Sequence, residues 1–289
     1  MSKPRIYIEN ENEFIGKTLK QKLGDTFSKQ EFIDLKAEQV YLPLQNVGGT
    51  FYVKSRPAST MAINLQKELD NIFTAHLSDA KLLYVAPSCV YPRDAPQPLK
   101  EESLLTGKLE PSCEYYALAE LMGIKLCQAY RKQYGCNFIS VISSGVYGPH
   151  DDFDPLSSHV IGALIRKFYE ADKHSLDEVV VWGTGKPKRD FVYVDDVADA
   201  MIFLMENYND GEPINIGSGE DISIEDLAWT IAKISGFEGD LTFDKTKPDG
   251  VMRKMLDTSK MDELGWKPKI DLSNGLQMSY RWFCDNYEP

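Results

Sequence analysis

Short apolar runs alternate with longer stretches of helical periodicity along most of the chain. Apolar and β-branched runs predict strands, and apolar residues three or four positions apart predict amphipathic helices. The predicted strands are 4–8, 31–35, 40–44, 81–86, 179–182, 190–194 and 242–244, and the predicted helices are 14–23, 61–75, 113–134, 195–206 and 271–287. Strands that alternate with helices indicate an α/β fold with a mostly parallel sheet.

Two of the predicted strands near the N-terminus lie unusually close together. Only Lys36–Gln39 separates strand 31–35 from strand 40–44, whereas a parallel crossover needs about a dozen residues or more. We therefore expect one crossover helix to be missing near residues 35–40. Either the first of these strands is absent from the sheet, or the two form a hairpin.

The composition is that of an acidic globular chain. It has 289 residues and a formal net charge of -12 at pH 7, which argues against nucleic acid or an anionic membrane as a partner. No apolar run could span a bilayer, the N-terminus lacks the apolar centre of a signal peptide, and the five cysteines show no metal-ligand spacing. We expect a cytoplasmic protein with no metal and no structural disulfide.

The candidate chemistry is concentrated between Lys81 and Tyr116. The Pro-rich segment after strand 81–86 cannot continue in a sheet, so Cys89 should emerge at the strand's carboxyl end, where open α/β sheets bind ligands. The helix that follows places Tyr116 and Glu120 one turn apart on the same face. A strand, a polar loop and a tyrosine on a helix form the core of a short-chain dehydrogenase/reductase site.

Several motifs resemble the GDP-L-fucose synthase family, extended short-chain dehydrogenases/reductases that epimerise carbons 3 and 5 of GDP-4-keto-6-deoxymannose and reduce its ketone. The motifs are SCVYP, EYYALAELMGIKLCQAYRKQYG, VYGPHDDF, SSHVIGALIRKF, VVVWGTGKPKRDFVYVDDVADA, KPDGVMRKMLD and LGWKP. The resemblance implies a Rossmann-like domain over residues 1–160, which also receives parts of 190–220, and an interleaved, smaller substrate domain over 161–289. It also implies a homodimer through long helices such as 113–134.

The family's cofactor turn is altered in this chain. Asn10 and Glu13 stand where the family has its first two glycines, and only Gly16 remains. Such glycines let the backbone approach a pyrophosphate at the helix N-terminus, and the carboxylates of Glu9, Glu11 and Glu13 would repel that group. We therefore expect NADP binding to be lost, so that the turn is an ordinary helix cap and the chain uses no cofactor.

The family's reductase residues are altered as well. Pro87 stands at the position of the catalytic serine, and Glu120 stands at the position of the lysine that pairs with Tyr116. The neighbouring Ser88 should point to the other side of an extended chain. A carboxylate beside Tyr116 disfavours the tyrosinate form. The reductase step is therefore expected to be absent.

The family's epimerase pair is retained as Cys89 and His159. Inversion next to a ketone needs a base, an acid on the opposite face and a donor to the enolate oxygen. We interpret Cys89 as the base, His159 as the acid and Tyr116, kept neutral by Glu120, as the donor. Without the resemblance, Cys89 would be interpreted as a small buried hydrophobe and His159 as a helix-capping side chain.

Five residues match family positions that line the GDP-sugar site: Arg166, Trp182, Arg189, Lys247 and Arg253. Arginine suits a diphosphate because it bonds in bidentate fashion, and an indole ring can stack on a base. The alternatives are a core tryptophan and solvated basic residues.

The sequence thus predicts a GDP-sugar-binding protein that epimerises C3 and/or C5 of a GDP-4-keto-6-deoxyhexose or related 4-keto sugar, without reduction. A first alternative is a catalytically inactive homologue that partners or regulates an active enzyme. A second is an intact NADPH-dependent GDP-L-fucose synthase with a rebuilt cofactor site.

Overall fold

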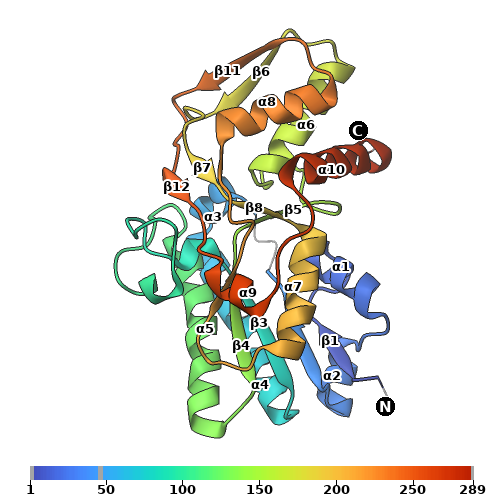
Figure 1. The fold of residues 1–289 in the computed structure, drawn as a ribbon, viewed down its shortest axis with the longest axis vertical. Helices are drawn as coiled ribbons and strands as arrows, with labels where there is room; N and C mark the ends of the chain where they lie inside the picture. Colours follow the sequence, from blue (N-terminus) through green and yellow to red (C-terminus); the bar gives the residue numbers. More distant parts are fainter. Residues whose placement is uncertain (1–2, 45–47, 288–289) are drawn as a thin grey trace.

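The computed structural model describes residues 3–44 and 48–287, and a five-stranded sheet lies at its centre (Figure 1). The strand order is β1-β2-β3-β4-β9, and every pair is parallel. The strands are β1 (Ile6–Ile8), β2 (Gln39–Leu42), β3 (Lys81–Pro87), β4 (Phe138–Ser143) and β9 (Ile214–Ile216). The prediction of a mostly parallel, Rossmann-like α/β fold is confirmed.

Helices cover both faces of this sheet because its strands are apolar on both sides. On one face, Leu83 and Val85 join a core cluster with residues of α1 (Phe14–Leu23) and α7 (Val194–Asn207). On the other, Leu82 and Tyr84 join a second cluster with residues of α4 (Pro57–Leu77) and α5 (Glu114–Tyr134). The alternation along β3 thus aims successive side chains at different helix pairs.

Two predictions for this region are wrong: that residues 31–35 form a strand, and that no crossover helix is present here. Residues 29–35 form helix α2 (Lys29–Leu35), which a capping box between Ser28 and Glu31 begins. Phe32 is fully buried and stacks on Tyr7 with ring centroids 4.4 Å apart. The strand before α2 is reduced to one parallel bridge between Phe27 and Tyr7. Because residues 29–35 are helical, the hairpin alternative is wrong, whereas the alternative that this segment is absent from the sheet is confirmed.

The remaining elements lie mostly beyond the carboxyl ends of the central strands (Figure 1). Three small sheets pair β5 with β8, β6 with β11, and β7 with β10 and β12. The strands are β5 (Gly145–Tyr147), β6 (Glu178–Trp182), β7 (Lys188–Arg189), β8 (Phe191–Tyr193), β10 (Ile222–Ser223), β11 (Asp240–Asp244) and β12 (Arg253–Lys254), and the helices are α3 (Thr50–Ser55), α6 (Val160–Lys173), α8 (Ile224–Ser235), α9 (Ser259–Leu264) and α10 (Leu272–Asn286). The chain returns to the central sheet through α7 and β9 after β6–β8. The division at residue 160 stays a prediction.

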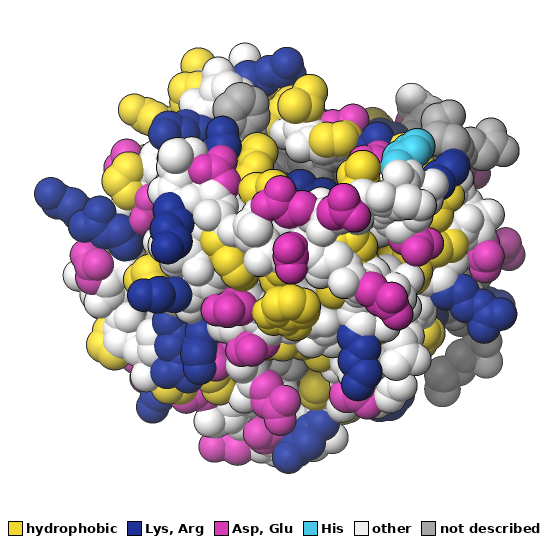
Figure 2. Space-filling model, turned by 90° about the horizontal axis from the view of Figure 1, so that it is seen from above, with side chains coloured by type: hydrophobic (Ala, Val, Ile, Leu, Met, Phe, Trp, Pro, Cys, Tyr) yellow, Lys and Arg dark blue, Asp and Glu magenta, His cyan; other side chains and the backbone are white. Residues whose placement is uncertain are grey.

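The surface carries charges of both signs. On the face shown in Figure 2, acidic side chains lie across the middle and many basic side chains lie nearer the edge. Within residues 3–44 and 48–287, no helix combines the length and the apolar character needed to cross a membrane.

Candidate functional site

The end of β3 positions the first candidate residue. After Pro87 the chain enters a single 3-10 turn, η1 (Ser88–Val90), which carries Cys89. The loop that follows includes the turn η2 (Glu101–Ser103). It pairs with the segment after β12 through a parallel bridge between Leu99 and Leu256. This link brings two distant segments of the chain together beside Cys89.

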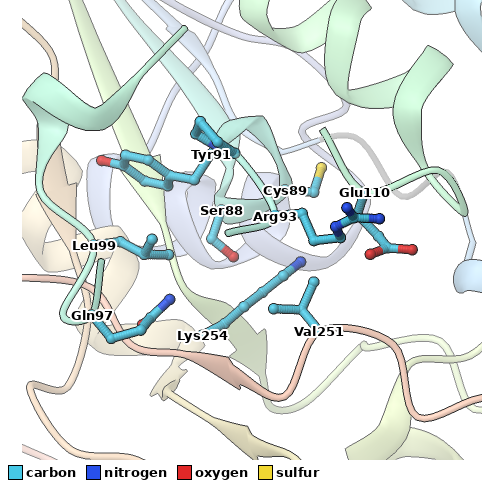
Figure 3. A pocket seen from close by; sticks show the side chains of 10 residues that line it. Ser88, Cys89, Tyr91, Arg93, Gln97, Leu99, Glu110, Val251 and Lys254 are labelled. Atoms are coloured by element: carbon cyan, nitrogen blue, oxygen red, sulfur yellow. The ribbon is translucent and has the colours of Figure 1, made fainter. Parts of the chain in front are cut away.

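A pocket opens at this junction (Figure 3). Lys254 extends from β12 toward the turn that carries Ser88 and Cys89. The complete lining is Ser88, Cys89, Tyr91, Pro92, Arg93, Gln97, Leu99, Glu110, Val251 and Lys254. Ser88 was expected to point away from the site, but the 3-10 turn brings it to the same pocket as Cys89.

Cys113, the N-cap residue of α5, donates its thiol to the Glu110 backbone oxygen at 3.7 Å. Interaction with the Cys113 thiol, together with burial, raises the pKa of Cys89 well above its usual value. Interaction with Cys89 lowers the pKa of Cys113 to about 7, and the charge of Lys254 acts in the same direction. Cys113 is therefore the more acidic of the two thiols.

His159 occupies the N-cap position of α6, yet its side chain makes no capping hydrogen bond. The helix-capping alternative is therefore not supported. Its side chain is exposed, but desolvation by the surrounding protein lowers its pKa; Asp152 opposes this shift and the charge of Lys254 adds to it. The charge of Lys254 thus lowers the pKa of His159 and also acts on Cys89, the other candidate proton-transfer residue.

Tyr116 is buried and stays a neutral phenol. Burial raises its pKa well above the usual value, and the charges of Glu120, Cys89 and Glu68 add to the effect. A neutral phenol can donate a hydrogen bond to an enolate oxygen. The acidic residue one turn along the helix thus favours the donor form, as the sequence indicates.

Beneath Tyr116 lies a buried carboxyl pair, Glu68 on α4 and Glu120 on α5. The Tyr84 hydroxyl donates to Glu120 Oε2 at 2.9 Å, whereas Glu120 Oε1 and both oxygens of Glu68 have no hydrogen-bond partner. Burial raises the pKa of Glu68 to about 9, with the charge of Glu120 contributing, and burial raises the pKa of Glu120 to about 7. The pair therefore retains protons at neutral pH.

This carboxyl pair makes stability depend on pH. In the unfolded chain both carboxyl groups have the ordinary pKa of 4.5, whereas in the folded chain the pKa of Glu120 is about 7 and that of Glu68 is about 9. Stability therefore falls as the pH rises through this window and levels off above it. Relative to the native chain, Glu68→Gln should increase the free energy of unfolding by about 1–3 kcal/mol at about pH 8 and change it little at about pH 5.

Urea denaturation of both proteins at the two pH values measures this difference. Glu114→Gln, on the exposed side of the same helix pair, is the matched control and should have no effect at either pH. An equal effect of Glu68→Gln at both pH values would contradict a proton-retaining pair.

Two of the five predicted GDP-sugar residues lie together. The ammonium of Lys247 lies 5.1 Å from the Trp182 ring centroid, and that of Lys167 lies 5.5 Å from it. Trp182 is 52% exposed, so the core alternative is wrong for this residue. Arg189 approaches the same region through a 3.5 Å hydrogen bond to the backbone oxygen of Asp249. An exposed indole beside cations suits an anionic, aromatic ligand.

The other two predicted residues are engaged with acidic side chains. Arg166 pairs with Glu170 at 2.7 Å and also lies over the Tyr287 ring. Arg253 donates to Asp221. Their predicted contacts with a GDP-sugar stay predictions.

The turn before α1 keeps the close backbone packing of a dinucleotide site. Asn10 has φ 53°, and its carbonyl accepts a hydrogen bond from Glu13 N–H at 2.9 Å. A Cβ on Gly16 would lie only 2.2 Å from the same carbonyl oxygen. Gly16 therefore allows the turn to close on the helix N-terminus, the geometry that pyrophosphate sites use.

Two of the three carboxylates in this turn have partners. Glu11 forms a 2.6 Å ion pair with Lys20, and Glu9 accepts a hydrogen bond from the Tyr7 hydroxyl. The predicted repulsion counted three free carboxylates, and it is overestimated because Lys20 neutralises Glu11. Residues 10–16 at the N-terminus of α1 fit a pyrophosphate, whereas the nicotinamide end lacks the family's serine and lysine because Pro87 and Glu120 stand there.

No metal site accompanies these groups in the part of the chain that the structure describes. Within residues 3–44 and 48–287, no cluster of three or more His, Cys, Asp or Glu side chains could hold an ion. All five cysteines are free thiols.

Comparison with known proteins gives a consistent result over the whole chain. Residues 9–217 match the model of the NAD dependent epimerase/dehydratase family. A probable GDP-L-fucose synthase 1 of Oryza sativa subsp. japonica is 49% identical over 86% of this chain and 76% of its own length. The GDP-L-fucose synthase of Escherichia coli K12 is 41% identical over 100% of this chain and 99% of its own length.

A similar solved structure contains a bound cofactor. The crystal structure of a GDP-L-fucose synthetase from Naegleria fowleri, bound to NADP, superimposes with a TM-score of 0.89 at 25% identity and covers 99% of this chain and 96% of that one. The prediction that no cofactor is used is therefore corrected: similar proteins hold NADP, and the cradle at Asn10–Gly16 is compatible with it. The loss of two glycines was too weak a basis for that prediction.

Proposed function

Because the chain belongs to the NAD dependent epimerase/dehydratase family and, within it, to the GDP-L-fucose synthases, we propose that it acts on a GDP-linked 4-keto-6-deoxyhexose and inverts C3 and/or C5. The observation that carries this proposal is that Cys89 and Lys254 line one pocket and that the Lys254 charge also acts on His159, while Tyr116 stays neutral.

Three side chains carry out the proposed epimerisation. Cys89 takes the proton next to the ketone, the Tyr116 hydroxyl donates to the enolate oxygen, and His159 returns a proton to the opposite face. His159 is exposed, so it can recover its proton from water. The exposed Trp182, with Lys247 and Arg189 nearby, is proposed to hold the guanine and the diphosphate.

NADP is part of the proposal. Residues 10–16 would hold its pyrophosphate at the N-terminus of α1. When bound, NADPH supplies the hydride that reduces a 4-keto group. Ser88 lines the pocket and can offer the hydroxyl that Pro87 lacks, which supports an intact synthase.

A second candidate is an epimerase that releases its product as the ketone. One observation favours it: the buried carboxyl of Glu120 replaces an ammonium beside Tyr116 and opposes the tyrosinate form. NADP can bind in either case. The difference lies in the rate at which hydride reaches the sugar.

Product analysis separates these functions. The protein is incubated with GDP-4-keto-6-deoxymannose, with and without NADPH, and the sugars are identified by NMR. An inverted and reduced GDP-hexose that forms only with NADPH indicates the synthase, and an inverted ketone in both samples indicates the epimerase. Unchanged substrate in both samples would contradict the proposal and favour the inactive homologue.

A homodimer through α4 and α5 is proposed from their exposed apolar side chains. Ile63, Phe73 and Leu77 on α4 and Met122 on α5 are each more than half exposed. Such a face is usually covered by a partner, and a second copy of the same chain is the partner that the family resemblance implies.

Introducing charge on this face should produce a monomer. We expect Phe73→Glu with Met122→Glu to halve the mass measured by light scattering, since two desolvated carboxylates oppose association. Ile33→Glu, an exposed apolar position on α2, is the control and should leave the mass unchanged. A native chain that is already monomeric would refute the dimer.

A further inference from the structure

A second pocket lies between the central sheet and the helices α4 and α5, and the proposed chemistry does not use it. The free space in it is about that of one water molecule. Its lining comes from the end of β2, from β3 and from the two helices: Leu42, Pro43, Glu68, Asn71, Tyr84, Val85 and Glu120. The carboxyl pair of Glu68 and Glu120 therefore faces a small hole inside the protein.

Three carboxyl oxygens in this pocket have no partner among the described residues. Glu68 is 5% exposed and Glu120 is 1% exposed. Both oxygens of Glu68 and Oε1 of Glu120 lack a hydrogen bond, whereas Glu120 Oε2 accepts from the Tyr84 hydroxyl at 2.9 Å. Buried polar atoms without partners are rare because each one costs free energy. Three such acceptors around one hole indicate a ligand that all of them can bind.

The side chains around the pair do not supply that partner. Lys29 approaches the pocket from α2, but its ammonium donates to Oδ1 of Asn71, which lines the pocket. The other titratable groups that face the pair are neutral. Burial raises the pKa of Tyr84, Tyr116 and Cys127, so none of them carries a charge at neutral pH.

The size and the oxygen ligands of the pocket select the kind of ligand. A water molecule has two protons and cannot donate to three acceptors, whereas a cation attracts all of them. Ca²⁺ takes about six to eight oxygen ligands and Mg²⁺ keeps several of its waters, and space for about one water is too small for either arrangement. Within residues 3–44 and 48–287, no group of three or more His, Cys, Asp or Glu side chains could hold a metal ion. A small cation with a single charge fits these limits.

We propose that Glu68 and Glu120 form a buried binding site for one monovalent cation, Na⁺ or K⁺. Both oxygens of Glu68 and Oε1 of Glu120 are its ligands, and the Tyr84 hydroxyl holds the Glu120 carboxyl in place. The cation takes the place of a proton on the pair, so one proton is released as one cation binds and the charge of the pocket does not change. The site joins α4 to α5, and the bound cation stabilises their packing.

Urea denaturation of the protein alone tests the inference, because the site needs neither sugar nor cofactor. The salts compared are sodium, potassium and tetramethylammonium chloride at equal ionic strength, and the last cation is too large for the pocket. At about pH 8.5 the native chain should be more stable in the first two salts. A Kd of about 20 mM would lower the unfolding equilibrium constant about tenfold at about 200 mM salt.

The response to salt should disappear in two cases. At about pH 5 both carboxyls are below their raised pKa values, so protons occupy the oxygens and the three salts should act alike. Glu68→Gln keeps the size of the side chain but removes its charge, so it should respond equally to the three salts at about pH 8.5. Glu114→Gln, at an exposed position on α5, is the matched control and should keep the native response.

Two results of the denaturation experiment would overturn the inference. One is equal stability of the native chain in all three salts at about pH 8.5. The other is a native-like response in Glu68→Gln, because it would place the cation elsewhere on the protein.

A crystal of the native protein soaked in a thallium(I) salt locates the ion directly. Thallium(I) has the charge of K⁺ and a similar radius, and it scatters anomalously. The inference predicts an anomalous peak between the Glu68 and Glu120 carboxyls, and no peak there in Glu68→Gln. Peaks confined to the protein surface would overturn it.

Discussion

Cys89→Ala is expected to abolish proton exchange at C3 and C5 of a GDP-4-keto-6-deoxyhexose. The variant removes the group assigned as the base, and loss of a general base costs about 100-fold to 10,000-fold in rate. Cys89 lines the pocket and is not part of the main core clusters, so the fold should survive. NMR of the sugar protons in deuterated water measures both exchange and inversion.

His159→Ala should behave differently from Cys89→Ala in the same assay. Cys89 can still remove the proton and return solvent deuterium to the same face, so exchange should continue while inversion falls by about 100-fold. Cys284→Ser is the control for both variants, since this exposed thiol lies on α10. The opposite pattern, with exchange lost in His159→Ala and retained in Cys89→Ala, would reverse the two roles.

Glu120→Lys is expected to raise NADPH-dependent reduction by about tenfold or more. An ammonium one turn from Tyr116 favours the tyrosinate form, whereas the present carboxyl opposes it. The new cation would also face the buried Glu68, so the two side chains can pair. NADPH oxidation is followed by absorbance at saturating substrate.

The control for this substitution is Glu114→Lys, which makes the same charge change at an exposed position on the same helix. It should leave reduction at the native rate. A native chain that reduces as fast as Glu120→Lys would contradict the role given to Glu120, and it would favour the intact synthase with Ser88 as the hydroxyl donor.

Most of the fold could be predicted from the periodicity of apolar residues. Helix α1 matches its predicted bounds, and β3 and α5 differ from theirs by a residue. The error at residues 31–35 has a local cause, because adjacent apolar residues in a short run fit a strand or a helix equally well. The capping box between Ser28 and Glu31 favours the helix, and the three-residue spacing of this pair can be recognised in the sequence.

The candidate site was predicted only in part. Cys89, Tyr116 and Lys254 lie in recognisable motifs, yet Lys254 was passed over in favour of its neighbour Arg253, which pairs with Asp221 instead. Cys113 stands three residues before Tyr116, but nothing in the sequence shows that α5 packs against the turn that carries Cys89. These pairings depend on how loops fold back, and periodicity does not describe that.

Other features could not be found from sequence at all. Glu68 lies on a helix where an acidic residue is normally exposed, and only the packing of α4 on α5 buries it against Glu120. In the turn before α1, the prediction from sequence erred in another way. Counting carboxylates between residues 9 and 13 overestimated their repulsion, because Lys20 neutralises Glu11.

The central claim is that the pocket beside Cys89 catalyses proton exchange next to a ketone. The most direct measurement places the native protein with GDP-4-keto-6-deoxymannose in deuterated water, without NADPH, and follows the sugar protons by NMR. The structure predicts loss of the C3 or C5 signal at a rate that depends on Cys89. If both signals persist while the nucleotide sugar is bound, the account of Cys89 and His159 as a proton-transfer pair is wrong.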